Sequence, residues 1–419
     1  MRKNWSKLLA LLVIAGLLAS VLAGCTKKAD NKPAEPEKPK QVEIVLWEQD
    51  EAADKVFDPR IQDFMKDNPN IKVTRVHYET EALRSNFQTA ARGGQGPNIV
   101  YGPDDNIGVF ATAGIIQPLD SFFSGDFLGS LNPIALDGNK LNGKLWGIPD
   151  RIGNHLTLVY NKKLVPKPPV DTEELLTFGK DFAAKNPGKY ALVFNQTEPF
   201  WLVPWLGGFG GKVFNEKNEP TLDTKAMVDS LTYVAKLKKE GVIPKESDYD
   251  AAEALFKEGK AAMIINGPWS WSGYSQKGVD IGLTRIPQVK GGGWPAPYTA
   301  TKSYFISNNV KDAAVKDAVK KFVEYMNSEK VQTELAKIHK QEPTNKKAAQ
   351  SDVIKNDPIM KDSSYQLQVG TPMPIIPQMR AVWDAMKPQW QLVLSNKLDP
   401  AAAAKKMQED AVKKIAEMK

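Results

Sequence analysis

"AAMIINGPWSWSGY", residues 261–274, joins an apolar run to two tryptophans across a Gly-Pro turn. The first six residues predict a buried strand, because short apolar runs bounded by turn residues are typical of strands covered on both faces. A turn normally lies at the surface, whereas a large aromatic side chain gains free energy by leaving water. Trp269 and Trp271 therefore either pack in a core or form a surface that receives a ligand.

Seven other runs of the same kind predict strands, and segments with helical spacing separate them. The predicted strands cover residues 42–47, 71–76, 98–102, 156–161, 191–195, 261–266, 281–286 and 303–307. Apolar residues recur every three or four positions between them; such faces are Met227, Leu231 and Val234, then Val315, Val319, Phe322 and Met326, and finally Met407, Ala411, Ile415 and Met418. Strands that alternate with one-sided helices predict an α/β protein.

The N-terminus predicts export. Three basic residues precede an uncharged apolar run at 8–22, which is too short to span a membrane comfortably and fits a secretion signal. The run ends in "LAGC", which resembles a bacterial lipobox and implies a signal peptide at 1–24 and a lipid on the thiol of Cys25. Residues 25–40 are rich in proline and charge and predict a flexible linker.

Composition limits the partners and the chemistry. The net charge of +7 falls to +4 without residues 1–24, and the charges are interspersed, so a nucleic acid is not an expected partner. Cys25 is the only cysteine, and His77, His155 and His339 lack metal-ligand spacing. Neither GxSxG nor a phosphate-binding GxxxxGK[ST] occurs. The sequence predicts no metal, no cofactor and a monomer.

Several stretches resemble the extracellular solute-binding proteins of ABC importers, namely "VLWEQD", "GQGPNIVYGPDDNIG", "AGIIQPLD", "NGKLWGIP" and "LVYNKKL". In the second half, "FNQTEPFWLVP", "ALFKEGKAAMIINGPWSWS" and "MPIIPQMRAVWDAM" resemble the maltose- and maltodextrin-binding members. The resemblance runs from about residue 42 to the end of the chain. It implies a lipid-anchored protein on the extracytoplasmic face of the cell membrane, which captures malto-oligosaccharides and delivers them to the permease subunits of an importer.

The same resemblance implies a type II periplasmic-binding-protein-like fold, in which two α/β lobes enclose a ligand cleft. Prolines and glycines mark about three crossings of a hinge, at 148–155, 287–297 and 342–352. The expected N-terminal lobe comprises 41–152 and 297–345, and the expected C-terminal lobe comprises 153–296 and 346–419.

A sugar site needs flat aromatic side chains for the apolar ring faces and short polar groups for the hydroxyl rim. The family pattern places Phe200, Trp269 and Trp383 against sugar rings. Trp271 is assigned to the binding residues as well, either against the sugar or behind Trp269. Trp205 and Trp390 are expected to pack in the core.

The polar binding residues also follow from the resemblance. Glu198 and Asp105 match carboxylates that accept hydrogen bonds from hydroxyls, with Asp104 taking the role of Asp105 if the alignment slips by one residue. Lys387 lies one helical turn after Trp383, where the family often has an arginine. Glu51 and Asn154 align with family binding positions near "LWEQDEAADK" and "PDRIGNHLTLVYN".

Three positions on the first lobe depart from the family pattern. Gly102 stands where the best-known members have a tryptophan, Asn106 where they have an arginine, and Asn154 where a glutamate is expected. The preferred chain length and linkage of the sugar therefore stay open, and another oligosaccharide, such as a cyclodextrin or a galacto-oligosaccharide, is an alternative.

Two other classes of function compete with a transport protein. A secreted glycoside hydrolase also has aromatic side chains and carboxylates, but a retaining enzyme needs two carboxyls about 5 Å apart. The family pattern assigns Glu198 and Asp105 to opposite lobes, so we expect no enzyme activity. A lipoprotein adhesin or scaffold is the third class, and it predicts no tight binding of a small molecule.

Overall fold

The computed structural model of the protein describes residues 41–50 and 52–418. The signal segment, Cys25, the linker and Glu51 lie outside the described residues. The strands are β1 (Val42–Glu48), β2 (Ile71–His77), β3 (Ile99–Pro103), β4 (Lys140–Leu141), β5 (Lys144–Leu145), β6 (Ile148–Ile152), β7 (Thr157–Asn161), β8 (Tyr190–Val193), β9 (Ala261–Asn266), β10 (Ile281–Thr284), β11 (Tyr298–Thr299), β12 (Thr301–Ile306), β13 (Glu342–Pro343) and β14 (Thr371–Pro372). All eight predicted strands are confirmed, with ends that differ by a few residues.

The helices fill most of the sequence between the strands. They are α2 (Ala53–Val56), α3 (Asp58–Asp67), α4 (Thr80–Arg92), α5 (Asn106–Thr112), α6 (Gly125–Ser130), α7 (Pro133–Asp137), α8 (Thr172–Lys185), the 3-10 helix η1 (Pro199–Trp201), α9 (Val203–Gly208), α10 (Lys225–Lys239), α11 (Tyr249–Lys257), α12 (Pro268–Gln276), α13 (Ala313–Met326), α14 (Glu329–His339), α15 (Lys346–Ala349), α16 (Asp352–Lys355), α17 (Pro358–Leu367), α18 (Gln378–Leu394) and α19 (Pro400–Ala416).

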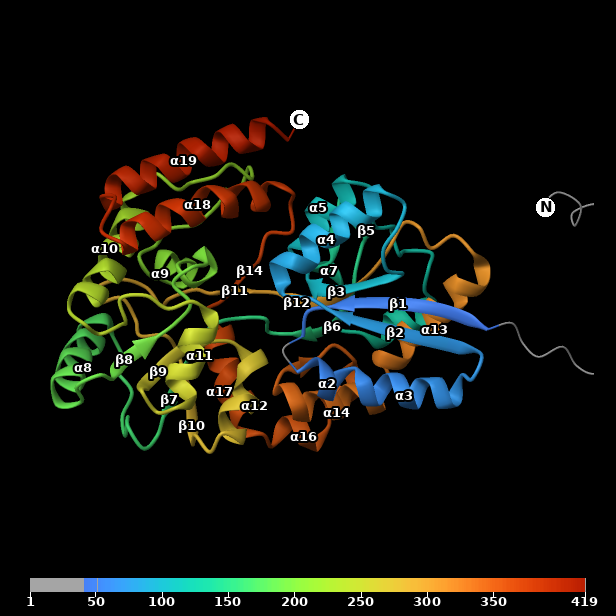
Figure 1. Cartoon of the computed structure of the whole chain (residues 1–419), viewed down its shortest axis with the longest axis horizontal. Helices are drawn as coiled ribbons and strands as arrows, with labels where there is room; N and C mark the ends of the chain where they lie inside the picture. Colours follow the sequence, from blue (N-terminus) through green and yellow to red (C-terminus); the bar gives the residue numbers. More distant parts are fainter. Residues whose placement is uncertain (1–40, 51, 419) are drawn as a thin grey trace, which may run out of the picture. The chain divides into compact units, whose positions relative to one another are not determined.

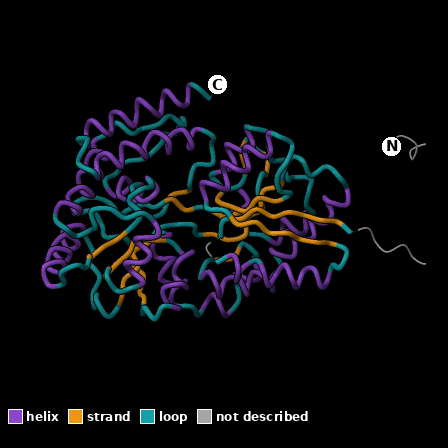
Figure 2. Tube along the Cα trace, viewed as in Figure 1, coloured by secondary structure: helices purple, strands orange, loops and turns teal. Residues whose placement is uncertain are grey.

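Two sheets organise the described residues (Figures 1 and 2). The larger sheet has the strand order β13-β6-β12-β3-β1-β2, and the smaller has the order β10-β7-β9-β8. In the larger sheet β1 pairs in parallel with β2 and β3, whereas β12 runs antiparallel to its neighbours β3 and β6. We call each sheet with the helices packed on it a lobe, the large-sheet lobe and the small-sheet lobe. The predicted two-lobed α/β fold is confirmed.

The large-sheet lobe has three layers. Phe64 of α3 and Phe322 of α13 pack on one face of the sheet with Ile44 and Leu46 of β1. Leu83 and Phe87 of α4 pack on the other face with residues of α5. Because side chains alternate along a strand, consecutive residues of the central strands supply both layers. This packing fixes the N-terminal ends of α4 and α5 beside the ends of β2 and β3.

The small-sheet lobe is built in the same way around β9. Met263 and Ile265 face a core that includes α8, α10, α18 and α19, whereas Ile264 faces a second core with α11 and α12. All six residues of β9 are buried, as the apolar run predicts. Met227, Leu231 and Val234 lie in the first of these cores, on the buried face of α10.

The chain passes between the sheets more than once. It leaves β6 of the larger sheet and enters β7 of the smaller after four residues, and it returns between β10 and β12. It leaves the larger sheet again after β13, and α17 then packs against β10. β11 and β14 pair in parallel with each other, so two connecting segments support one another.

None of the helices within 41–50 and 52–418 combines the length and the apolar character needed to cross a membrane. In the same ranges, no three histidine, cysteine or acidic side chains come together as metal ligands would.

Candidate functional site

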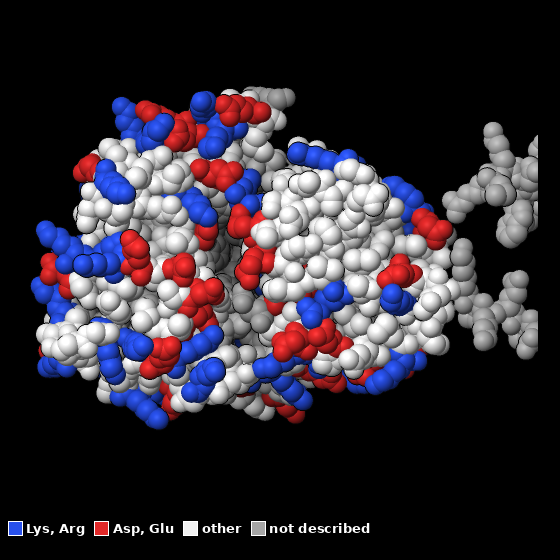
Figure 3. Space-filling view, in the orientation of Figure 1, with Lys and Arg blue, Asp and Glu red and all other residues white. Residues whose placement is uncertain are grey.

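A cleft of about 360 Å³ opens between the two lobes. Figure 3 shows a hollow between the two halves of the described chain, with acidic side chains along it. Its lining from the large-sheet lobe and the crossings includes Gln49, Glu79, Glu81, Asp105, Asn154 and Lys302; its lining from the small-sheet lobe includes Asn195, Glu198, Phe200, Trp201, Tyr249, Asp250, Trp269, Arg380, Trp383, Asp384 and Lys387.

Aromatic rings form a continuous row along the small-sheet side of the cleft. The ring centroids of Trp383 and Phe200 lie 6.4 Å apart, those of Phe200 and Trp201 5.6 Å, and those of Trp201 and Tyr249 6.4 Å. Each pair meets edge to face, with interplanar angles between 64° and 76°. Rings in this arrangement are rigid and well packed, yet Phe200, Trp269 and Trp383 stay partly exposed to the cleft.

The Gly-Pro turn after β9 explains where Trp269 lies. A Cβ atom at Gly267 would approach the six-membered ring of Trp269 to 2.0 Å, so only glycine lets the indole fold back over the backbone. Pro268 then begins α12 at a position where its missing N–H is not needed. The turn therefore holds the indole against the protein on one side and leaves the cleft on the other.

Trp271 does not line the cleft, so the expectation that it belongs to the binding residues is wrong. It is only 1% exposed and packs with Phe256 and Tyr274 in the core behind β9. The two indoles lie two positions apart on α12, which places them on different sides of the helix. Trp205 and Trp390 are fully buried in the small-sheet lobe, as predicted.

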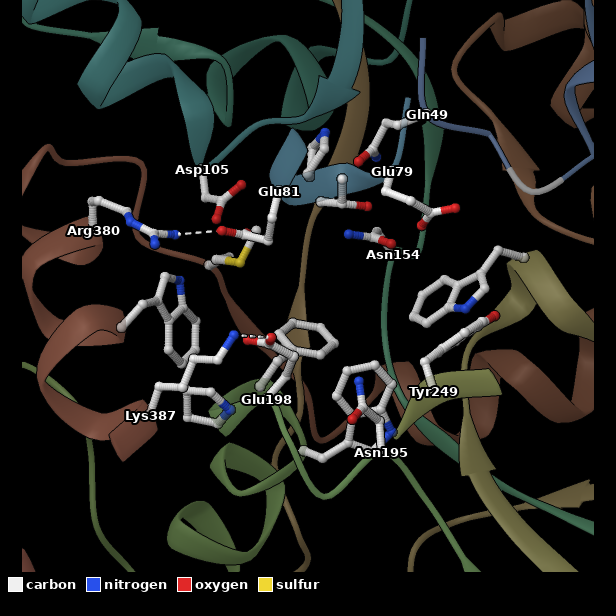
Figure 4. A pocket seen from close by; sticks show the side chains of 18 of the residues that line it. Gln49, Glu79, Glu81, Asp105, Asn154, Asn195, Glu198, Tyr249, Arg380 and Lys387 are labelled. Atoms are coloured by element: carbon white, nitrogen blue, oxygen red, sulfur yellow. Dashed lines mark hydrogen bonds and ion pairs between the residues drawn. The ribbon is translucent and has the colours of Figure 1, made fainter. Parts of the chain in front are cut away.

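Glu198 and Lys387 face each other within the cleft (Figure 4). Lys387 Nζ donates to Glu198 Oε1 over 2.5 Å, and both side chains are about one-third exposed, at 42% and 31%. Glu198 precedes η1 and Lys387 lies on α18, so both belong to the small-sheet lobe. Each group has bonding capacity left for a ligand hydroxyl.

Asp105 and Asp104, the two alternatives in "GPDDNIG", have different surroundings. Asp105 lines the cleft, whereas the carboxylate of Asp104 accepts bonds from the backbone N–H and hydroxyl of Thr301, over 2.7 and 2.8 Å. The structure thus places Asp105 and not its neighbour in the cleft. Burial raises the pKa of Asp105 to about 6, Arg84 and Arg380 act against this, and a hydrogen bond with Trp383 also favours the carboxylate.

Replacing Asp105 by asparagine is expected to stabilise the empty protein at pH 7.5 by about 1–2 kcal/mol. The raised pKa means that the folded state holds the proton more tightly than the unfolded chain, whose aspartate pKa is near 3.9. Wild-type stability from this group is therefore full below about pH 4 and is lost as the pH rises through 6. Melting temperatures of both proteins at pH 4 and 7.5 measure the effect.

The gain is expected to shrink to about 0.5 kcal/mol at pH 4, where the folded carboxyl is protonated and the unfolded one is about half protonated. The exposed Asp137→Asn is the control, and it should change stability by less than about 0.5 kcal/mol at either pH. An equal destabilisation by Asp105→Asn at both pH values would contradict the prediction.

Two of the three departures on the first lobe lie behind the cleft surface. Gly102 is buried in β3, and Asn106 is 6% exposed, with its amide donating to the carbonyl of Pro103 over 3.2 Å. Neither lines the cleft. Asn154 does line the cleft. Its backbone N–H donates to the carbonyl of Ala300 and so holds this crossing against the segment that leads into β12.

Several lining residues escaped the sequence analysis. Arg380, Trp383, Asp384 and Lys387 form one stripe of α18 with the spacing i, i+3, i+4, i+7, so the helical period was the signal that could have found Arg380 and Asp384. Gln49 is another lining residue that the sequence did not indicate. It is 4% exposed, and its Oε1 accepts no hydrogen bond from the described residues.

Comparison with known proteins agrees with this geometry. The chain is 27% identical over 380 residues to the maltotriose-binding protein of Pyrococcus abyssi, covering 89% of this chain and 82% of that protein. It is 24% identical over 419 residues to the galactooligosaccharide-binding protein of Bacillus subtilis, covering 97% of both.

A solved structure is similar as well. The maltose/maltodextrin-binding domain MalE from Bdellovibrio bacteriovorus, bound to maltotriose, has a TM-score of 0.86 and 42% identity, covering 90% of this chain and all of that one. The sequence model of the family described as bacterial extracellular solute-binding protein matches residues 60–362. This chain therefore belongs to the bacterial extracellular solute-binding proteins.

Proposed function

We propose that this protein is the substrate-binding lipoprotein of an ABC sugar importer and that its ligands are malto-oligosaccharides. The observation that carries the proposal is the row of aromatic rings along a cleft whose opposite wall is polar. The MalE domain, 42% identical to this chain, was solved with maltotriose bound.

The cleft has the two kinds of surface that a sugar chain requires. Pyranose rings expose C–H groups on their faces, which stack on Phe200, Trp269 and Trp383. Their hydroxyls lie on the rim and reach the carboxylates of Glu198 and Asp105, because charge-assisted hydrogen bonds are the strong ones. Asn154, Lys387 and the unpaired Gln49 Oε1 supply further donors and acceptors. Glu51 remains assigned to the site by the family pattern alone.

Binding is coupled to closure of the hinge. The lobes, 41–152 with 297–345 and 153–296 with 346–419, move as rigid bodies about the crossings. The aromatic row holds the sugar first, and contacts with Asp105 and Gln49 form only when the cleft closes. The ligand favours the closed state by this difference in contacts, and moving a mostly open hinge to mostly closed needs about 5.5 kcal/mol.

The permease then recognises the closed form at the membrane. The lipid on Cys25 holds the protein at the extracytoplasmic face, because acyl chains contribute about 0.8 kcal/mol for each buried methylene. The protein acts as a monomer and needs no cofactor.

Calorimetry against maltotriose, longer maltodextrins, cyclodextrins and galacto-oligosaccharides tests the proposal. We expect tight binding of a linear maltodextrin, together with compaction in X-ray scattering when the ligand is added. Tighter binding of a galacto-oligosaccharide would favour that sugar as the ligand. Two observations support this second candidate: the galactooligosaccharide-binding relative from Bacillus subtilis and the missing aromatic side chain at Gly102. Absence of binding to every sugar would refute the proposal.

Incubation with maltotriose separates a binding protein from a glycoside hydrolase. Glu198 is paired with Lys387 on the small-sheet lobe, and Asp105 lies on the large-sheet lobe, so we do not expect the two carboxylates to act as one acid–nucleophile pair. A hydrolase would need one of them as a proton donor. We expect no glucose release over hours at micromolar protein, and release that depends on Glu198 would contradict this.

A further inference from the structure

A chain of ion pairs connects the two lobes across one end of the cleft (Figure 4). Arg380 on α18 donates to Glu81 Oε2 on α4 over 3.1 Å, and its other nitrogens bind Asp384 one helical turn further on, over 2.5 and 3.1 Å. α4 is packed in the large-sheet lobe and α18 in the small-sheet lobe. Arg84 holds Glu81 from behind through both carboxylate oxygens.

The lobes also touch directly at this end. Trp383, three residues after Arg380, and Asp105, at the N-terminal end of α5, both line this end of the cleft. A Cβ atom at Gly108 would approach the carbonyl oxygen of Ile375 and the nitrogen of Pro377 to 2.4 Å, so the α5 backbone lies against the segment that leads into α18. No space for a sugar unit remains between the backbones there.

The opposite end of the cleft is lined differently. Tyr249, Asp250 and Trp269 come from α11 and α12, and Glu79 faces them from the start of α4 (Figure 4). Tyr249 hydrogen-bonds Ser270, the neighbour of Trp269, over 2.7 Å, so both belong to the small-sheet lobe. Beyond them, among the described residues, a hydrogen bond of 2.7 Å between exposed Lys55 and Gln276 joins α2 to α12, without an ion pair.

We propose that Arg380 is a specificity-determining residue, which with Glu81 and Asp384 closes the Trp383 end of the cleft and makes a bound oligosaccharide extend only toward Tyr249. This proposal rests on the proposed function. A sugar unit beyond Trp383 would have to displace the Arg380 guanidinium and part α5 from residues 375–377. Burial raises the pKa of Glu81, but Arg84 and Arg380 outweigh it and lower that pKa, so the pair stays ionised at neutral pH.

The test compares maltotriose with two derivatives, one carrying a 4-nitrophenyl group at the reducing end and one a benzylidene group at the non-reducing end. We expect the wild type to bind one derivative at least tenfold more weakly than maltotriose and to tolerate the other. Arg380→Ala is expected to recover at least fivefold of that loss and to leave the tolerated derivative unchanged relative to maltotriose. Glu81→Gln removes the other partner of this ion pair, on the large-sheet lobe. It is also expected to raise the affinity for the derivative that the wild type binds weakly.

Arg60→Ala is the matched control, because Arg60 makes a similar ion pair with Glu334 over 2.9 Å but does not line the cleft. Equal tolerance of both derivatives by the wild type, or a change in Arg380→Ala that is the same for all three ligands, overturns the inference alone. Failure of the wild type to bind maltotriose and any other oligosaccharide overturns the proposed function as well. Melting temperatures confirm that each variant is folded.

Discussion

Replacing Trp269 by alanine is expected to weaken oligosaccharide binding roughly 30- to 150-fold and to lower the stability of the empty protein by only about 1 kcal/mol. A ligand-contacting aromatic side chain is worth about 2–3 kcal/mol of binding, and each 1.4 kcal/mol is a factor of ten. Trp269 is partly exposed and covers Gly267, so little core packing depends on it. Calorimetric titration and thermal unfolding without sugar measure the two quantities.

Trp271→Ala is the matched control from the same helix. Its indole is fully buried, so truncation should lower the free energy of unfolding by about 3–5 kcal/mol. We expect the affinity of the protein that remains folded to change less than fivefold. The two substitutions are thus expected to have opposite effects: Trp269→Ala lowers mainly the affinity, and Trp271→Ala lowers mainly the stability. Loss of stability in Trp269→Ala as large as in Trp271→Ala would contradict the position of Trp269 in the cleft.

Replacing Arg151 by methionine is expected to lower the free energy of unfolding by about 3–5 kcal/mol, because it leaves buried acids without their cation. Arg151 is 3% exposed and binds the carboxylate of Asp50, lies 3.3 Å from Asp150, and donates to the hydroxyl of Tyr101 over 2.8 Å. Burial alone would raise the pKa of Asp50, but the Arg151 guanidinium together with Lys302, His339 and the backbone N–H of Ala52 outweighs burial and holds that pKa far below its usual range. Urea unfolding measures the loss.

Arg60→Met is the control for this prediction, since Arg60 pairs with the half-exposed Glu334 at the surface. Its loss should stay below about 1 kcal/mol. The losses in Arg151→Met and Arg60→Met are directly comparable, because both variants remove one guanidinium from the large-sheet lobe. A loss below about 1 kcal/mol for Arg151→Met would show that the buried acids find other partners or protonate without penalty.

The strand β6 shows where sequence patterns stop being informative. Its residues "IPDRI" contain a proline and two adjacent charges, and we expected a crossing there and not a strand. Asp150 and Arg151 are nevertheless buried, because Tyr101, Gln332 and Asp50 satisfy them from elements far away in the sequence. A charged pair in a strand is therefore not a signal of exposure when distant partners compensate it.

The residues of the candidate site also fall into those that the sequence indicated and those that it did not. Phe200, Trp269, Trp383, Glu198 and Asp105 were all named because their motifs resemble those of the family, and all of them line the cleft. Trp271 was misplaced, because its motif does not say which side of the helix faces the core. Arg380 and Asp384 were missed, although they share the stripe of α18 that carries Trp383 and Lys387.

Apolar runs and helical spacing were enough to predict the eight strands and the α/β layers, since these depend on neighbours within a few positions, and the resemblance of short motifs to the family indicated the aromatic residues next to the turns. The meeting of Arg380 with Glu81, 299 residues apart, depends on how the two lobes pack. The burial of Arg151 among acids depends on how the strands and helices of the large-sheet lobe pack together. Such contacts join charges whose partners come from separate elements, and no local pattern records the distance between them.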